Sequence, residues 1–419
     1  MTTENILSNT QPQPQALEAS INNPGNLPLF IDPDEKIPAI DMSSFINKLT
    51  AALFPLIKFL KSDQCRNHPV WGNLLPYEVE SYGSGSAGYC VRPDVVLTPK
   101  GPKICELDFV PSGRGFLLDC LPTDSAKMAY LNSYRKWYGQ MGYNNIGYAI
   151  ATIDSCLPEV ELFSKALKQI LNININPVNV DETNLDKYDL VDRLYYRSEV
   201  VTPNNIGNSA YVSSHPFMDS KMVLALIHDP TMEQPLIDSI GLGNLIFLHE
   251  IIPETYALQI ARQNRRVLLE LIARDYKQYV IKNGEVETQT NWGSRGVMIG
   301  SQFGENIFRE ALFNGKSPKN KVIGNRSIVQ KFSYSYNFSE YWDAAVAGSI
   351  PAHSLGDLPV SSMANITNQW IYSRLGIYFL LSERNEKTIV PKYALLTMRP
   401  DRLAHGASNT IDAVLKVKG

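Results

Sequence analysis

The stretch VRPDVVLTPKGPKICELDFVPSGRG, residues 91–115, carries most of the residue types that could do chemistry. Arg92 and Asp94 lie two apart in one apolar run, and Glu106 and Asp108 lie two apart in the next. Alternate side chains of a strand point to the same face, so each pair shares a face. If the two runs pair as a hairpin, three carboxylates and a guanidinium converge on one patch. Carboxylates are the hard oxygen ligands that Mg²⁺ takes, and an arginine beside them suits an anionic phosphoryl oxygen.

The segment between the two runs, residues 98–103, contains Pro99, Gly101 and Pro102 and predicts the turn of this hairpin. The alternative is a solvated hairpin whose charges alternate only because strands alternate. Spacing by itself leaves both interpretations open.

Length and composition set the outer limits. A chain of 419 residues is longer than one core usually serves, which predicts two or three packed subdomains. A hydrophobic content of 44% and a charged content of 19% are typical of soluble globular proteins, and a net charge of −3 gives no electrostatic reason to expect nucleic acid or an acidic membrane as partner. The N-terminus lacks the features of a secretory signal, and no apolar run is long enough to span a membrane. Five cysteines without a CxxC pair favour reduced thiols over disulfides or a zinc site, and hence a cytoplasmic location.

The hydrophobic periodicity predicts an α/β (α+β) protein behind a flexible leader. Helices are expected over 44–62, 124–141, 157–171, 232–275 and 303–314, and strands over 279–282 and 327–332. The segments RLGIYFLLS and KYALLTMRP predict one strand each.

A second candidate motif begins with a strand lysine, Lys282, and continues with the glycine-rich turn Gly293-Ser294-Arg295-Gly296 and a further strand. Such a lysine can reach nucleotide phosphates, and backbone N–H groups without an obstructing Cβ can fold over a triphosphate. A generic hairpin turn is the alternative.

The order of these motifs resembles the circularly permuted ATP-grasp family, which is related to glutathionylspermidine synthetase. A usual ATP-grasp chain places its metal-binding strands after the strand lysine and the glycine-rich loop, whereas here the RxD…ExD hairpin comes far earlier. Seven further segments follow in the expected order: DRLYYR (192–197), DSKMVLAL (219–226), PETY (253–256), YVIK (279–282), NWGSRGV (291–297), SIVQK (327–331) and TMRP…HGASNT (397–410). The resemblance covers roughly residues 75–412.

This resemblance implies an ATP-dependent carboxylate–amine ligase that forms an amide or peptide bond through an acyl phosphate, with ATP and Mg²⁺ as cofactors. It implies that Asp94, Glu106 and Asp108 bind the metal and that Arg92 and Arg295 act in catalysis. The implied ATP-binding residues are Lys221, Lys282, Gly293, Ser294, Arg295, Gly296, Gln330 and Lys331, with Gln330 and Lys331 in the adenine pocket. The candidate substrate-binding residues are Arg114, Arg374, Arg399, His405 and Asn409.

Two departures from the family pattern stand out. Asn283 follows the strand lysine where the family usually has Pro, and the insertion NGEVETQT lengthens the path to the glycine-rich turn. The alternative functions are a catalytically inactive nucleotide-binding or interaction protein of the same fold, and a phosphotransferase.

The expected domain plan has five parts. Residues 1–38 are the leader, 39–125 a helix plus the metal-binding hairpin, 126–230 a substrate region, 231–335 the lobe with the strand lysine and glycine-rich loop, and 336–419 the C-terminal part of the core. The expected partners are a small-molecule or peptide carboxylate and an amine. The oligomeric state is left open, with a homodimer as one option.

Overall fold

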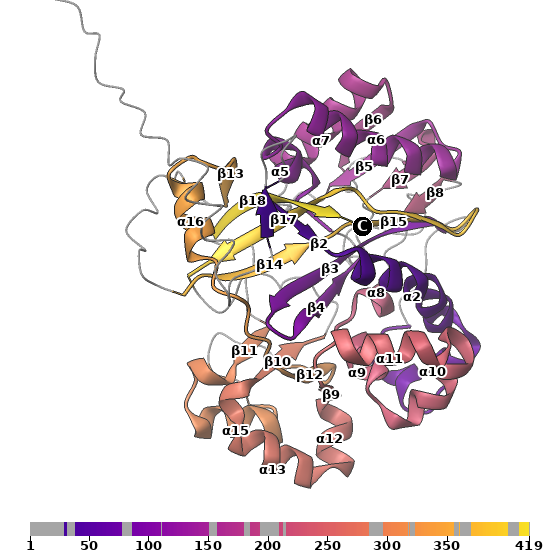
Figure 1. Cartoon of the computed structure of the whole chain (residues 1–419). Helices are drawn as coiled ribbons and strands as arrows, with labels where there is room; N and C mark the ends of the chain where they lie inside the picture. Colours follow the sequence, from indigo (N-terminus) through magenta and orange to yellow (C-terminus); the bar gives the residue numbers. More distant parts are fainter. Residues whose placement is uncertain are drawn as a thin grey trace, which may run out of the picture.

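The computed structural model describes residues 29–31, 38–77, 86–109, 111–150, 157–179, 185–192, 209–212, 215–284, 296–316, 318, 323–355, 360, 370–400 and 410–418. It confirms the mixed α/β class: a large mixed sheet, a smaller antiparallel sheet and helices packed on both. The large sheet runs from an α/β lobe at the top of the view through the middle of the molecule (Figure 1), and the small-sheet lobe lies at the bottom.

The large sheet is organised around β3. Its order is β1-β2-β18-β17-β14-β3-β8-β7-β5-β6, with β4, β13, β15 and β16 attached beside this path. The strands are β1 Leu29–Ile31, β2 Pro38–Asp41, β3 Ser86–Thr98, β4 Gly101–Asp108, β5 Asn145–Ile150, β6 Asn174–Asn179, β7 Leu190–Asp192, β8 Ala210–Val212, β13 Ala352–Leu355, β14 Tyr372–Gly376, β15 Phe379–Ser382, β16 Lys387–Ile389, β17 Tyr393–Arg399 and β18 Thr410–Lys418. β3 pairs antiparallel with β4, β14 and β15 and parallel with β8, so it joins the antiparallel part of the sheet to the parallel part.

The segment RLGIYFLLS forms two strands, β14 and β15, where the sequence predicted one. The break falls at Ile377 and Tyr378, and the Tyr378 hydroxyl donates to the carbonyl of Ser112 at 2.6 Å. This residue therefore contacts a neighbouring turn instead of extending the strand.

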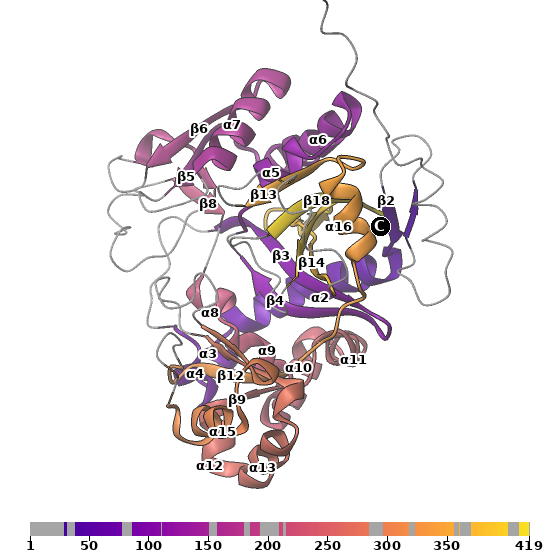
Figure 2. The same cartoon turned by 90° about the vertical axis from the view of Figure 1, so that its left-hand side faces the viewer.

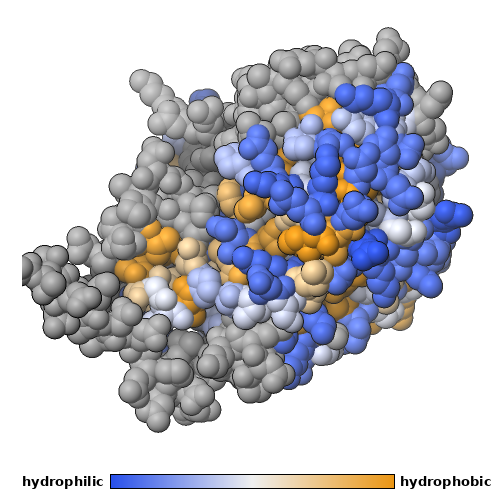
Figure 3. All heavy atoms as spheres, turned by 90° about the horizontal axis from the view of Figure 1, so that it is seen from above, coloured by the Kyte–Doolittle hydropathy of each residue, from blue (hydrophilic) through white to orange (hydrophobic). Residues whose placement is uncertain are grey.

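The α/β lobe places helices over the parallel strands β8, β7, β5 and β6. Its helices are α5 Arg114–Asp119, α6 Asp124–Met141, α7 Leu157–Leu171 and the short η1 Leu185–Lys187. α6 and α7 span the predicted ranges, and Thr123 caps α6 by accepting from the Ala126 N–H at 3.1 Å. The aromatic face of α6, formed by Tyr130, Tyr134, Trp137 and Tyr138, is buried. Seen from the side of this lobe (Figure 3), polar side chains cover most of the described surface, with hydrophobic ones between them.

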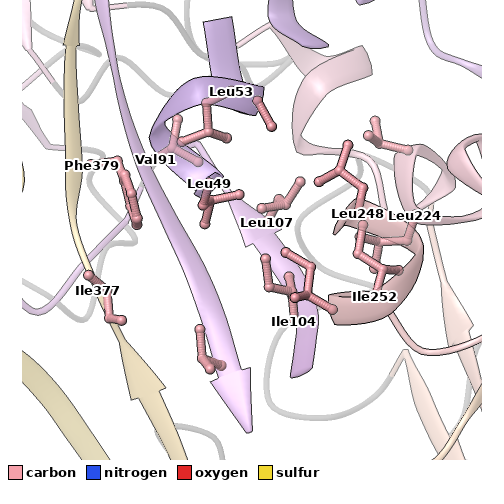
Figure 4. Packing of buried hydrophobic residues seen from close by; sticks show 14 of the residues in the cluster. Leu49, Leu53, Val91, Ile104, Leu107, Leu224, Leu248, Ile252, Ile377 and Phe379 are labelled. Carbon is pink, nitrogen blue, oxygen red and sulfur yellow. The ribbon is translucent and has the colours of Figure 1, made fainter. Parts of the chain in front are cut away.

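A layer of helices covers one face of the hairpin formed by β3 and β4. These helices are α2 Ser43–Lys61, α3 Asp63–Arg66, α4 Trp71–Leu74, α8 Pro216–Asp219, α9 Met222–Ile227, η3 Pro230–Met232, α10 Glu233–Ile240 and α11 Leu242–Ile251. Pro55 lies inside α2 without ending it. Val91, Ile104 and Leu107 of the hairpin pack with Leu49 of α2 and Leu248 of α11 (Figure 4). No helix among the described residues is long and apolar enough to cross a bilayer.

The small-sheet lobe has the strand order β11-β10-β12-β9. Its elements are β9 Thr255–Ala257, α12 Leu258–Asn264, α13 Arg266–Arg274, η4 Tyr276–Gln278, β10 Tyr279–Asn283, β11 Val297–Ile299, η6 Gly300–Gln302, α15 Glu305–Asn314 and β12 Ser327–Lys331, and α16 Ser339–Val346 follows in the connection back to the large sheet. The prediction of helices throughout 232–275 is wrong at β9, because the three residues of this strand pair with β12 and complete the sheet. The division into five domains remains a prediction.

His215, beside α8, gives the fold a specific sensitivity to acid. Its ring stacks on Phe217 with centroids 5.1 Å apart, and burial together with nearby Lys61 lowers its pKa to about 4. In the unfolded chain a histidine has a pKa of about 6.5, so the unfolded state binds a proton at a higher pH than the folded state does. The stability that this difference contributes is therefore fully present above about pH 6.5 and is lost as the pH falls toward 4. We expect the titration of His215 to lower the free energy of unfolding by about 2 kcal/mol when the pH falls from 7.5 to 5.

Urea unfolding at the two pH values, on wild type and His215→Phe, measures this effect. The phenylalanine keeps a ring against Phe217 and cannot titrate, so the variant should lose about 2 kcal/mol less than wild type over this range. Equal losses in the two proteins would contradict the assignment to His215.

Candidate active site

The predicted hairpin is formed by β3 and β4, and it places its charged residues on one face. Arg92 lies directly opposite Asp108, and Asp94 lies directly opposite Glu106. Directly opposed residues of paired strands project to the same side of the sheet, and so do residues two apart in one strand. All four side chains therefore share a face.

A β-bulge keeps the opposite face of the hairpin apolar. The register shifts between Asp94 and Val95, so that Val95 pairs with Ile104 and Cys105 becomes the extra residue. Because of this extra residue, Ile104 and Leu107 both reach the core although they lie three apart in the sequence. The bulge thus separates the charged face from the packed face.

Asp94 is held between two arginines. Arg92 Nε donates to Asp94 Oδ1 at 3.1 Å, and Arg374 Nη1 donates to Asp94 Oδ2 at 2.6 Å. Arg92 also donates to Asp108 Oδ2 at 3.0 Å and to the Ser112 carbonyl at 2.7 Å. Burial would lower the pKa of Arg92, but Asp94 and Asp108 outweigh it and raise that pKa above its usual value. The guanidinium of Arg92 is therefore charged and fixed in place.

Glu106 forms an ion pair with Lys221, whose Nζ lies 2.8 Å from Glu106 Oε1. Lys221 directly precedes α9, so the helical layer brings it to the hairpin from far along the chain. Burial would raise the pKa of Glu106, but Lys221 and Lys282 lower it to about 2. Burial would likewise lower the pKa of Lys221, yet Glu106 raises it above its usual value. Both groups are charged at neutral pH.

Asp219 is a further carboxylate of this site, and the sequence analysis gave it no role in the site. Its Oδ1 accepts from the Phe109 N–H at 2.9 Å, which ties the end of β4 to α8. Burial and the neighbouring Asp108 raise the pKa of Asp219 to about 7, and Glu106 adds to the rise. Its place two residues before Lys221 was the one available signal. The raised pKa reflects first the burial of this carboxyl and then the negative charge of its neighbours, and a bound cation would offset the second of these.

The small-sheet lobe lies below β4 in both views of the ribbon (Figure 1, Figure 2). A cleft between the charged face and the small sheet is lined by residues of both. It holds about 760 Å³ of space when the part open to solvent is counted, and the cavity itself measures about 120 Å³. Its walls carry apolar side chains from both sheets together with polar groups of the hairpin, the small sheet and β14. The residues that line it include Asp94, Cys105, Glu106, Val280, Lys282, Val297, Ile299, Gln330, Lys331, Tyr372 and Arg374.

Lys282 projects from the small sheet toward the hairpin. Its Nζ donates to the Cys105 carbonyl and to Gln330 Oε1, at 2.7 Å in both cases. Burial lowers the pKa of this lysine. The structure therefore brings the strand lysine and the RxD…ExD hairpin together, although they lie far apart in the sequence.

The other predicted ATP-binding residues fall into two groups. Gln330 and Lys331 line the cleft, and the Gly296 carbonyl accepts from the Asn283 N–H at 2.6 Å, beside the strand lysine. Gly293, Ser294 and Arg295 lie outside the described residues, so the path of the glycine-rich turn over the cleft stays a prediction.

The predicted substrate-binding residues are dispersed. Arg374 lines the cleft, and Arg399 lies opposite Tyr372 in the β14–β17 pairing, on the cleft side of the sheet. His405 and Asn409 lie outside the described residues.

Arg114 does not reach this cleft. Its Nη1 lies 2.6 Å from Asp192 Oδ2, the two side chains are 1% and 0% exposed, and Tyr134 and Tyr148 lie against the guanidinium. A guanidinium buried in this way is unsuited to bind a substrate, so we assign it a structural role. The sequence did not reveal this ion pair, because Asp192 lies in a strand far along the chain.

The fit of Mg²⁺ to the hairpin is partial. Among the described residues, no group of three or more His, Cys, Asp or Glu side chains is arranged to hold a metal ion. Asp94 does not fit as a ligand in this arrangement, because both of its oxygens bond to arginines. Glu106 and Asp108 do fit, since Mg²⁺ bound with a nucleotide uses one or two carboxylates and completes its shell with phosphate oxygens and water.

Comparison with known proteins adds little to this geometry. No family model matches the chain, and no curated protein matches it. One solved structure that it resembles is provisionally described as a gamma-glutamylcysteine synthetase from Methylobacillus flagellatus KT, with a TM-score of 0.38, 12% identity and 84% of each chain covered. A similarity at this level carries no argument about function.

Proposed function

We propose that this protein is an ATP-dependent carboxylate–amine ligase of the circularly permuted ATP-grasp type. One observation carries the proposal: the charged hairpin of the large sheet and the lysine-bearing small sheet face each other across one cleft. An ATP molecule between two such walls would place its base among apolar side chains and its phosphates among cations. The hairpin precedes the small sheet in the chain, which is the order expected of a permuted arrangement.

The roles of the residues follow from their positions. Val280, Val297 and Ile299 offer an apolar surface to the base, while Lys221 and Lys282 offer positive charge to the phosphates. Glu106 and Asp108 would hold Mg²⁺, which supplies charge neutralisation at the phosphates when bound.

The chemistry in this proposal is activation of a substrate carboxylate. A carboxylate oxygen attacks the γ-phosphorus of ATP, the bond to the β–γ bridging oxygen breaks, and ADP leaves. An amine then attacks the acyl carbon and releases phosphate. Arg374 lines the cleft beside Asp94 and can stabilise negative charge that develops on the transferred group. Fixed cations, rather than a covalent enzyme group, do this work.

Calorimetric titration of ATP, with and without Mg²⁺, tests the nucleotide site. We expect Mg²⁺-dependent binding in the wild type and an affinity lower by about tenfold or more in Lys282→Met, because a charge-assisted bond to phosphate is lost. Lys277→Met, an exposed lysine of the same lobe, is the matched control and should bind like the wild type.

The outcomes separate the candidate functions. The absence of ATP binding in the wild type would overturn the ligase proposal. Binding without turnover would indicate the nucleotide-binding protein, and ADP release that needs no amine would indicate the phosphotransferase.

A further inference from the structure

The hydrogen bonds of Gln330 indicate a role other than the predicted contact with adenine. Gln330 Oε1 accepts from Lys282 Nζ at 2.7 Å, and Gln330 Nε2 donates to Thr255 Oγ1 at 2.9 Å. The Thr255 hydroxyl in turn donates to the Pro253 carbonyl at 2.5 Å. Thr255, Gln330 and Lys282 are 0%, 1% and 8% exposed. Both ends of the amide are therefore engaged inside the protein, which leaves it poorly placed to recognise adenine.

The strand register explains why these three side chains meet. Gln330 on β12 lies directly opposite Thr255 on β9 and directly opposite Val280 on β10. Lys282 lies two residues beyond Val280, so it shares the face of this row and reaches Gln330 diagonally. The row crosses three strands of the small sheet and ends at an ammonium that projects toward the hairpin.

The ammonium bridges the two walls of the cleft. Its second acceptor, the Cys105 carbonyl, belongs to the bulge of β4 in the large sheet. A lysine ammonium has three donors, so these two bonds hold it at a defined point between the lobes. A bulged residue is left out of the regular strand ladder, which leaves its carbonyl available to this lysine.

We propose that Thr255 and Gln330 position Lys282 as a latch across the cleft, which bonds the Cys105 carbonyl in the free protein and turns to a nucleotide phosphate on binding. Gln330 accepts a hydrogen bond from the lysine both in the free protein and in the nucleotide complex. The second hydrogen bond of the lysine goes to the Cys105 carbonyl in the free protein and to the phosphate in the complex. No proton is transferred. The phosphate half of this inference rests on the proposed function, whereas the latch half does not.

The thiol of Cys105 reports on the latch. It lines the cleft, so a closed cleft should keep its alkylation slow. Cys65, Cys90 and Cys120 are buried elsewhere and provide internal controls in the same digest. Treatment with N-ethylmaleimide, followed by peptide mass spectrometry, measures each thiol separately.

Two substitutions of Gln330 should move alkylation and affinity differently. Gln330→Met keeps the length but removes the acceptor, so alkylation of Cys105 should become about tenfold faster and ATP affinity about tenfold lower. Gln330→Glu supplies a stronger acceptor, so alkylation should stay at or below the wild-type rate. ATP affinity should still fall, because the ammonium remains paired with the new carboxylate.

Two matched substitutions of Thr255 test the end of the row that lies farthest from the hairpin. Thr255→Val removes the hydroxyl and should change both readouts in the direction of Gln330→Met, while Thr255→Ser keeps the hydroxyl and should restore wild-type values. This pair keeps the inference testable if a Gln330 variant fails to fold, which faster alkylation of Cys65, Cys90 and Cys120 would reveal.

Each outcome decides the inference. Wild-type alkylation and affinity in both Gln330→Met and Thr255→Val would overturn it, and so would equal acceleration of alkylation in Gln330→Met and Gln330→Glu. If the wild type binds no ATP, the proposed function fails. The alkylation rates of the variants then still test whether Lys282 bonds the Cys105 carbonyl across the cleft, because that half of the inference does not depend on ATP.

Discussion

Replacing Glu106 by Gln is expected to lower Mg²⁺-dependent ATP turnover by on the order of 100-fold. The substitution keeps the size of the side chain but removes the charge that lies 2.8 Å from Lys221 and beside Asp108. The metal loses a charged ligand, and Lys221 loses the partner that fixes it near the phosphates. ADP release across a panel of carboxylate and amine pairs measures turnover, and titration of ATP with and without Mg²⁺ measures how far binding depends on the metal.

Asp94→Asn is the informative comparison for this variant. Both oxygens of Asp94 bond to arginines, so its loss should release Arg92 and Arg374 and reduce turnover. The gain in ATP affinity on adding Mg²⁺ should persist in Asp94→Asn and vanish in Glu106→Gln. If Mg²⁺ fails to increase ATP affinity in both variants, Asp94 must be assigned as a metal ligand after all. Full turnover in Glu106→Gln would remove the carboxylates of the hairpin from the site.

The hairpin was predictable because its geometry is local. A spacing of two residues fixes which side chains share a face, and the turn residues fix where the strands reverse. Thr98 pairs with Gly101 across the turn, and this register brings Arg92 opposite Asp108. The bulge at Cys105 had no comparable signal, because it depends on how Ile104 and Leu107 meet helices that come later in the chain.

The partners of the hairpin were harder to predict because they are distant in the sequence. Lys221 reaches Glu106 from the start of α9, and Arg374 reaches Asp94 from β14. Lys221 was suggested only through the resemblance to a family, and Arg374 only as a candidate substrate-binding residue. β9 was missed for a related reason: its three residues precede a helix, and only their pairing with β12 makes them a strand. The assignment to the ATP-grasp family itself remains a proposal.

Arg114, predicted to bind substrate, instead carries the largest expected effect on stability. Arg114→Met should lower the free energy of unfolding by about 3–5 kcal/mol, because it leaves the carboxylate of Asp192 buried without its cation. Tyr138 donates to Asp192 at 2.6 Å, but a neutral hydroxyl replaces little of the charge that is lost. Urea unfolding at neutral pH measures the change, with Lys136→Met, an exposed lysine of α6, as a control expected to lie within about 0.5 kcal/mol of the wild type.

The double variant Arg114→Met, Asp192→Leu separates the buried charge from the packing. Removing both charges should recover about 2 kcal/mol or more of the loss, since a buried ion pair replaced by apolar residues is often close to neutral. A loss below about 1 kcal/mol in Arg114→Met would contradict the buried pair. The same variants bear on function, because this pair anchors the turn whose Ser112 carbonyl accepts from Arg92 at 2.7 Å. We therefore expect Arg114→Met to impair turnover as well, and the double variant to regain part of it, because Arg92 is positioned by the lobe that Arg114 stabilises.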